Sequence, residues 1–73
     1  MTVEIFKTNV NTRKYADRLV ERIHKTFSMY NANFDLEDCD NILRVQCNSG
    51  SIRSYALIMF LKDFGCQAEV LSD

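Results

Sequence analysis

The sequence predicts a single α+β domain with the element order strand, helix, strand, strand, helix, strand. Apolar residues recur at every second position in four short segments, and every third or fourth position in two longer ones. These are the periods of strands and helices. The 73 residues include no proline and only two glycines, so no linker is expected and residues 1–73 form one domain.

The first two predicted elements are a strand and a helix. Residues 2–8 alternate, and Val3 and Ile5 share one side, which predicts a strand with one apolar face. Residues 12–30 follow the helical period, with Asn11 or Thr12 as the N-cap and the Asn-containing segment 31–33 as the stop. The apolar stripe comprises Ala16, Leu19, Val20, Ile23, Phe27 and Tyr30.

A hairpin, a second helix and a short strand follow. Two alternating runs, 32–37 and 43–47, flank a turn at 38–41. Cys47 ends the second run and is expected in the core, as most free cysteines are. Ser51 is the expected N-cap of a helix over 52–64, which Gly65 ends in the left-handed conformation; residues 67–70 form the last strand.

This order is typical of the ferredoxin-like βαββαβ fold, a four-stranded antiparallel sheet with two helices on one face. Each strand–helix–strand unit is expected to cross right-handed. Three connections, 9–12, 38–41 and 65–67, are then expected at the same end of the sheet. That end is the first place to look for a site.

Composition and charge argue against several classes of partner. Nine basic and ten acidic residues give a net charge of −1, so no basic field is available for nucleic acid. No run approaches the ~20 apolar residues that span a bilayer, and no signal region is found. We therefore expect no nucleic-acid or membrane partner and a cytoplasmic location. Three cysteines without a secretion signal do not indicate a disulfide framework.

Three stretches resemble a known family: residues 7–11, Val45, and the ending Phe64-Gly65-Cys66-Gln67-Ala68-Glu69-Val70. From residue 3 to 70 the chain resembles the heavy-metal-associated (metallochaperone-like) domains. The resemblance implies the ferredoxin-like fold. In that family a Met-x-Cys-x-x-Cys loop between the first strand and the first helix binds a soft ion such as Cu(I) or Zn(II) through two thiolates.

That metal-binding motif is absent here. By the resemblance, Val10 takes the Met position, and Thr12 and Tyr15 take the two Cys positions. Neither hydroxyl residue replaces a thiolate for a soft metal. The chain is therefore identified as a degenerate member of the family, with the fold implied and the usual chemistry missing.

Cys39 and Cys66 offer an alternative metal site at the predicted loop end. Two thiolates with a nearby carboxylate are a set of ligands for Cu(I) or Zn(II). Against this, Asp38 and Asp40 flank Cys39, and nearby carboxylates raise a thiol pKa and oppose thiolate formation. The two cysteines also match no metal-ligand spacing.

Other titratable residues give no catalytic pattern. His24 is the only histidine and is expected on the surface or partly buried, outside any triad. The acidic run predicts a solvated face and turn, because it lacks the Gly and terminal Glu of a calcium loop. We expect no enzyme activity. The run comprises Asp35, Glu37, Asp38 and Asp40.

The second helix carries two apolar stripes, and one sheet cannot bury both. The resemblance points Leu57, Phe60, Leu61 and Phe64 inward. The second stripe indicates an interface for a homodimer or a protein partner, unless helix–helix packing inside the monomer covers it. It comprises Ile52, Tyr55, Ala56, Ile58 and Met59.

The sequence therefore favours a non-catalytic interaction module with a heavy-metal-associated-like fold and no metal at the usual loop. The alternative is a divergent Cu(I) or Zn(II) carrier that uses Cys39 and Cys66. A small-molecule sensing domain is a third hypothesis, although no residue pattern specifies its ligand cleft.

Overall fold

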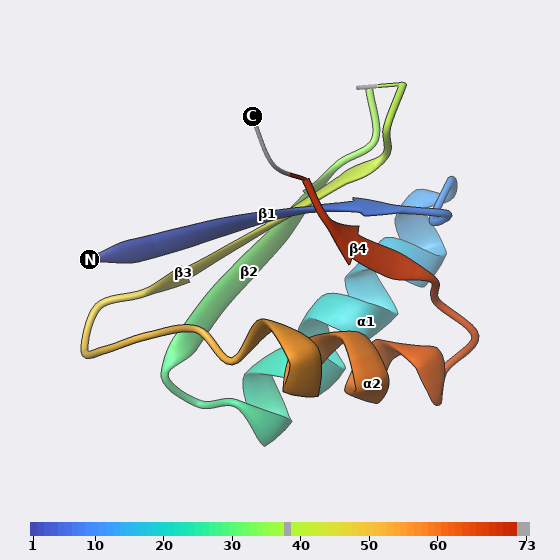
Figure 1. Cartoon of the computed structure of the whole chain (residues 1–73). Coiled ribbons are helices and arrows are strands. Elements are labelled where there is room, and N and C mark those ends of the chain that lie inside the picture. Colours follow the sequence, from blue (N-terminus) through green and yellow to red (C-terminus); the bar gives the residue numbers. More distant parts are fainter. Residues whose placement is uncertain (38, 72–73) are drawn as a thin grey trace.

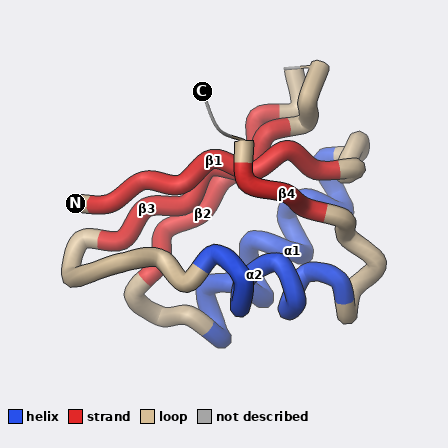
Figure 2. The backbone as a smooth tube through the Cα atoms, in the orientation of Figure 1, coloured by secondary structure: helices blue, strands red, loops and turns tan. Residues whose placement is uncertain are grey.

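A computed structural model describes residues 1–37 and 39–71 of the chain. The elements form one antiparallel sheet in the order β2-β3-β1-β4, with both helices on one face (Figures 1 and 2). This is the ferredoxin-like βαββαβ arrangement, as the sequence predicts. The elements are β1 (Thr2–Thr8), α1 (Arg13–Thr26), β2 (Tyr30–Asp35), β3 (Ile42–Cys47), α2 (Ser54–Lys62) and β4 (Ala68–Val70).

The helix-facing side of β1 is not the one expected from its alternation. Phe6 is fully buried opposite Leu43 of β3, whereas Val3 is 40% exposed on the open side of the sheet. Alternation in this strand does not distinguish the two faces, because an aromatic side chain stands on the side opposite to Val3 and Ile5. The prediction that Cys47 lies in the core is confirmed.

Helix α1 begins as predicted and ends earlier. The Thr12 hydroxyl accepts a hydrogen bond from the Tyr15 N–H at 3.3 Å, which makes Thr12 the N-cap. The helix stops at Thr26, and Tyr30 is the first residue of β2 instead of the last of the apolar stripe. A buried Tyr30 fits both the end of the helix and the start of β2, so apolar spacing alone places the boundary wrongly. The predicted stop, residues 31–33, lies within β2.

Helix α2 is shorter than predicted and begins without a side-chain cap. Its N-cap is Arg53, not Ser51. Leu57 and Leu61 are fully buried, as expected, but Phe64 is 40% exposed. The resemblance points Phe64 inward, but Phe64 lies beyond the last helical residue and no longer follows the direction of Leu57 and Leu61. Among the described helices, none is long and apolar enough to cross a bilayer.

Candidate functional site

Three connections meet at one end of the sheet, as predicted. The Thr8 N–H donates to the Asp40 carbonyl at 3.2 Å, and the Thr8 hydroxyl donates to the Asn41 carbonyl at 2.6 Å. On the other side, the Asn9 N–H donates to the Gln67 carbonyl at 3.2 Å. The end of β1 is therefore joined to both the hairpin turn and the α2–β4 turn.

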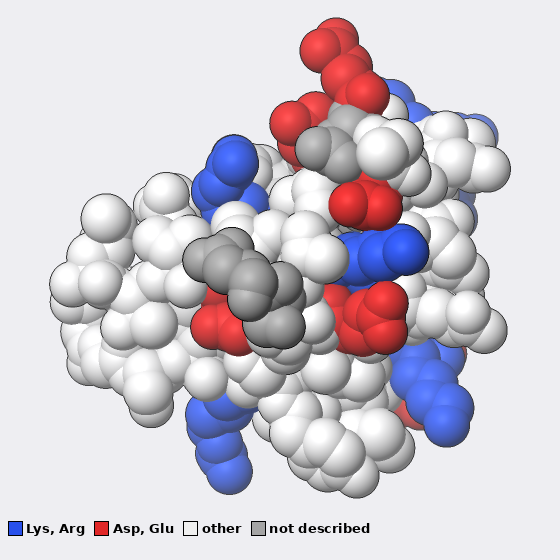
Figure 3. Space-filling view, turned by 45° about the horizontal axis from the view of Figure 1, so that its top comes forward, with Lys and Arg blue, Asp and Glu red and all other residues white. Residues whose placement is uncertain are grey.

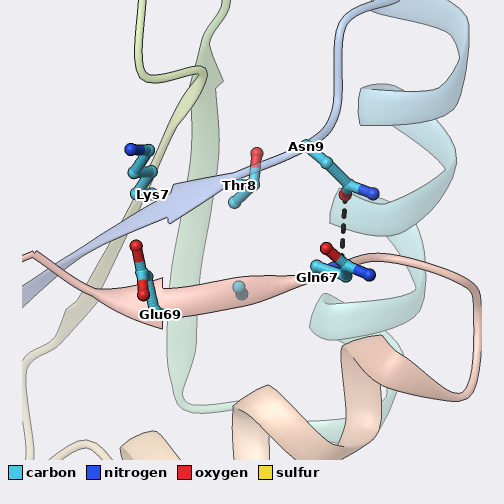
Figure 4. A pocket seen from close by; sticks show the side chains of 6 residues that line it. Lys7, Thr8, Asn9, Gln67 and Glu69 are labelled. Atoms are coloured by element: carbon cyan, nitrogen blue, oxygen red, sulfur yellow. Dashed lines mark hydrogen bonds between the residues drawn. The ribbon is translucent and has the colours of Figure 1, made fainter.

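A polar cleft of about 290 Å³ lies at this end, between β1 and β4 (Figure 4). The Asn9 side-chain oxygen accepts a hydrogen bond from the Gln67 N–H at 3.0 Å, and the Lys7 ammonium lies 3.8 Å from the Asp40 carboxylate. Glu69 is the register partner of Lys7 across the two strands. Several polar groups of the cleft are thus already paired within the protein. These pairs connect β1 to its neighbouring segments.

The three positions that the resemblance assigns to a metal loop all have structural roles. Val10 is fully buried. Thr12 caps α1, and the Tyr15 hydroxyl donates to the Phe64 carbonyl at 2.6 Å. Burial, and then the nearby Cys66, raise the pKa of Tyr15 above its usual value. At Tyr15, where the resemblance places a thiolate, a phenol thus fastens α1 to the chain beyond α2.

Cys66 is explained by the way α2 ends. The Gly65 N–H donates to the Lys62 carbonyl, and the Cys66 N–H donates to the Leu61 carbonyl, both at 3.0 Å. This pair of bonds defines a Schellman motif, in which a left-handed residue is followed by an apolar one that contacts the last turn. Gly65 has φ of 79°, and Cys66 and Leu61 are both fully buried. Cys66 is therefore the apolar residue of the motif.

The surroundings of the two candidate thiols do not favour a metal site. Burial raises the pKa of the Cys66 thiol to about 11, whereas a soft metal requires the thiolate. Cys39 is exposed in the hairpin turn. No group of three or more His, Cys, Asp or Glu side chains within residues 1–37 and 39–71 is arranged to hold a metal ion. Asp38, part of the predicted acidic turn, lies outside the described residues.

Acidic side chains gather at the tip of the β2–β3 hairpin, where Figure 3 shows them projecting from one end of the molecule. The Asp35 carboxylate accepts a hydrogen bond from the Glu37 N–H at 3.2 Å. It acts locally on the turn, as Asp side chains commonly do. This agrees with the expected solvated face.

His24 has a role that the sequence analysis missed. Its Nε2 accepts a hydrogen bond from the backbone N–H of Ala32 in β2 at 3.0 Å. No spacing signal identifies such a contact, because it depends on how α1 lies along an edge strand. His24 is exposed otherwise, as expected.

The second apolar stripe of α2 is only partly covered. Tyr55 is 75% exposed and Met59 is 43% exposed, and they lie one helical turn apart. Ile52, Ala56 and Ile58 are half-buried. We refer to Tyr55 and Met59 as the outer face of α2.

The opposite flank of α2 is covered by a chain of aromatic rings that begins at Phe27, the residue after α1, and by Arg22 of α1. The rings of Phe27 and Phe60 lie 5.3 Å apart edge to face, and those of Phe60 and Phe64 lie 5.1 Å apart. The Arg22 guanidinium lies 5.8 Å from the centre of the Phe64 ring, within the range of a cation–π contact. Helix packing within the monomer therefore explains one flank and leaves the outer face without cover.

A second cleft, of about 380 Å³, lies between α2 and β4. Ile58 connects it to the outer face, because Ile58 lies three residues from Tyr55 on the helix. We call this cleft the α2–β4 groove. Its lining residues are Ile58, Lys62, Gly65, Cys66, Gln67 and Ala68.

Comparison with models of protein families, with curated proteins and with solved structures finds no match to this chain. The resemblance to heavy-metal-associated domains therefore stays a prediction from the sequence pattern.

Proposed function

We propose that this chain is a non-catalytic protein-interaction module, a heavy-metal-associated-like domain whose metal-loop positions have become structural. The outer face of α2 is its binding surface. The observation that carries the proposal is the exposure of Tyr55 (75%) and Met59 (43%) side by side on one helix. No hydrogen bond to the Tyr55 hydroxyl is found within residues 1–37 and 39–71.

In the monomer, the exposed side chains of the outer face contribute little of the free energy that their burial would give. Burying a large apolar side chain contributes roughly 1.5–3 kcal/mol relative to leaving it exposed. Tyrosine and methionine are both enriched at protein interfaces, where tyrosine supplies area at low entropic cost and methionine adapts its shape. A partner that covers both side chains recovers this free energy. The lining of the α2–β4 groove extends the apolar surface beside them.

A photo-reactive side chain tests this function in the cells that produce the protein. Benzoylphenylalanine replaces Tyr55 in one version, and Asn33 on the open face of the sheet in the matched control. We expect discrete covalent adducts from position 55 that are missing from position 33. The additional substitution Met59→Glu, which places a charge in the contact, should abolish them.

Two results would count against the proposal. Equal adduct patterns from positions 55 and 33 would mean that proximity alone produces the cross-links. Adducts from position 55 that survive Met59→Glu would mean that the outer face does not supply the contact.

A further inference from the structure

The two edge strands of the sheet, β2 and β4, differ in how their outward backbone groups are satisfied. At β2, the Ala32 N–H donates to the His24 imidazole at 3.0 Å, and the Arg13 guanidinium donates to the Phe34 carbonyl at 3.3 Å. Both side chains come from α1. A free edge invites pairing with another chain, and proteins commonly block it with charged or covering groups. Helix α1 blocks the edge of β2.

The edge of β4 has no such block. The Gln67 carbonyl accepts from the Asn9 N–H just after β1 at 3.2 Å, and the Leu71 N–H donates to the Ile5 carbonyl of β1 at 2.9 Å. In an antiparallel pair such groups alternate in direction, so the N–H and C=O groups of Ala68 and Val70 point away from the sheet. Within residues 1–37 and 39–71, no hydrogen-bond partner for these outward groups is found.

The α2–β4 groove runs beside this open edge. Side chains of Ala68 and Val70 lie on the helix side of β4, because these residues pair with the buried Thr8 and Phe6 of β1. Val70 is 41% exposed. The open backbone groups and the apolar groove therefore face the same space.

The charge of the groove is one-sided. Lys62 is the one charged residue among those that line it, and the rest are apolar, small or amide-bearing. No described acidic side chain lines the groove. A ligand that carries a carboxylate near Lys62 complements this lining.

We propose that an extended segment of a partner protein adds to β4 as a fifth strand. Its backbone pairs with Ala68 and Val70, its alternate apolar side chains enter the α2–β4 groove, and an acidic residue meets Lys62. Strand addition of this kind draws affinity from main-chain hydrogen bonds and specificity from alternate side chains. The inference rests on the proposed function and names the chemistry of the partner.

A segment fits this surface better than a second copy of the chain does. Strand β4 has three residues and offers two outward-facing ones, Ala68 and Val70. A stable dimer interface buries about 800 Å² per partner. Pairing two such short edges covers little of that area, whereas an extended segment needs only the edge and the groove.

The first experiment selects peptides and then maps how they bind. A phage-displayed library of short random peptides is panned on the immobilised full chain, with counter-selection on the Ile58→Glu variant. We expect enriched peptides that alternate apolar and polar residues and carry an Asp or Glu. In their complexes, amide exchange at Ala68 and Val70 should slow, while exchange at Ala32 on the blocked edge stays unchanged.

The second experiment uses the selected peptides with N-methyl groups at successive positions. A strand presents every second N–H to its neighbour, so methylation should weaken binding on the order of tenfold or more at alternate positions only. The variant Lys62→Gln should weaken binding about fivefold, in the range of one exposed charge pair. The matched control is Lys14→Gln, at an exposed position of α1, and it should leave binding unchanged.

The outcomes separate this inference from the proposed function. Peptides that need Tyr55 and Met59 but leave the Ala68 and Val70 amides unprotected would overturn strand addition and keep the interaction module. A library that yields no peptide dependent on Ile58 would overturn strand addition as well. Loss of cross-links from position 55 would count against the proposed function and would leave strand addition to be judged by the peptide experiments.

Discussion

Cys66 shows how its surroundings decide what a cysteine can do. Its backbone N–H closes the Schellman motif at the end of α2, and its side chain is fully buried against the last turn. A buried thiol in apolar surroundings keeps its proton and reacts slowly. The residue therefore acts as a small apolar side chain, although its position in the sequence suggested a ligand.

The raised pKa of Cys66 predicts a pH dependence of stability. The pKa rises from its ordinary value of 9.0 to about 11 on folding, so the folded state holds the proton more tightly than the unfolded state. The resulting contribution to the free energy of unfolding is complete below pH 9 and is lost as the pH rises to about 11.

We expect urea unfolding of the wild-type chain to lose stability more steeply across that interval than unfolding of Cys66→Ala. Tyr15 titrates in both proteins, but Cys66 also raises its pKa, so the difference between the two slopes reports the thiol together with its effect on Tyr15. Parallel slopes would show that Cys66 ionises equally easily in the folded and unfolded states.

The hydroxyl of Tyr15 provides a second test at the residue scale. It donates to the Phe64 carbonyl at 2.6 Å, and the ring remains in place in Tyr15→Phe. We expect this variant to lose about 1 kcal/mol, the net worth of one hydrogen bond, in equilibrium unfolding. The variant Tyr55→Phe is the matched control, because its hydroxyl has no such partner within the described residues. Equal losses in both variants would argue against a structural role for the hydroxyl of Tyr15.

At the scale of elements, the turn after α2 depends on one glycine. Gly65 has φ of 79°, a left-handed conformation that other residues adopt only at a cost. A methyl group there would meet the Tyr15 hydroxyl at 3.7 Å, which is an ordinary contact. The expected cost of Gly65→Ala is therefore mainly conformational, about 1 kcal/mol.

Thermal unfolding of Gly65→Ala should show this loss, with Tyr15→Phe/Gly65→Ala losing about the sum of the two single effects. A clash with Tyr15 would instead make the double variant more stable than that sum. An unchanged melting temperature in Gly65→Ala would contradict the assigned backbone strain.

The same elements show why the sequence predicts the order of the helices and strands better than it predicts their ends. Alternation and helical spacing identify all six elements, because each buries one face. They misplace Tyr30, since it is buried whether it ends a helix or begins a strand. They also miss the contact of His24 with Ala32 and the Schellman role of Cys66. These depend on how elements pack across the chain, which no local period encodes.

For the whole molecule, the structure predicts that freshly reduced protein does not take up soft metal stoichiometrically. Competition of Cu(I) and Zn(II) against a coloured chelator should give no more uptake than an unrelated protein with one exposed thiol, because Cys39 is exposed and Cys66 is buried. The variant Cys39→Ser should remove whatever uptake remains, and Cys66→Ser should not. Tight uptake lost in both variants would restore the carrier hypothesis.

Self-association of the chain would need a surface large enough to hold two copies together. The outer face of α2 and the α2–β4 groove expose apolar surface, and a second copy of the chain is the simplest protein that could cover it. The open edge is too short for that role, and α1 blocks the other edge through Arg13 and His24. We therefore expect light scattering at high micromolar concentration to give the monomer mass of 8.5 kDa. A dimer that dissociates on Met59→Glu would instead assign the outer face to self-association. A monomer in both proteins leaves the outer face available for a different protein partner.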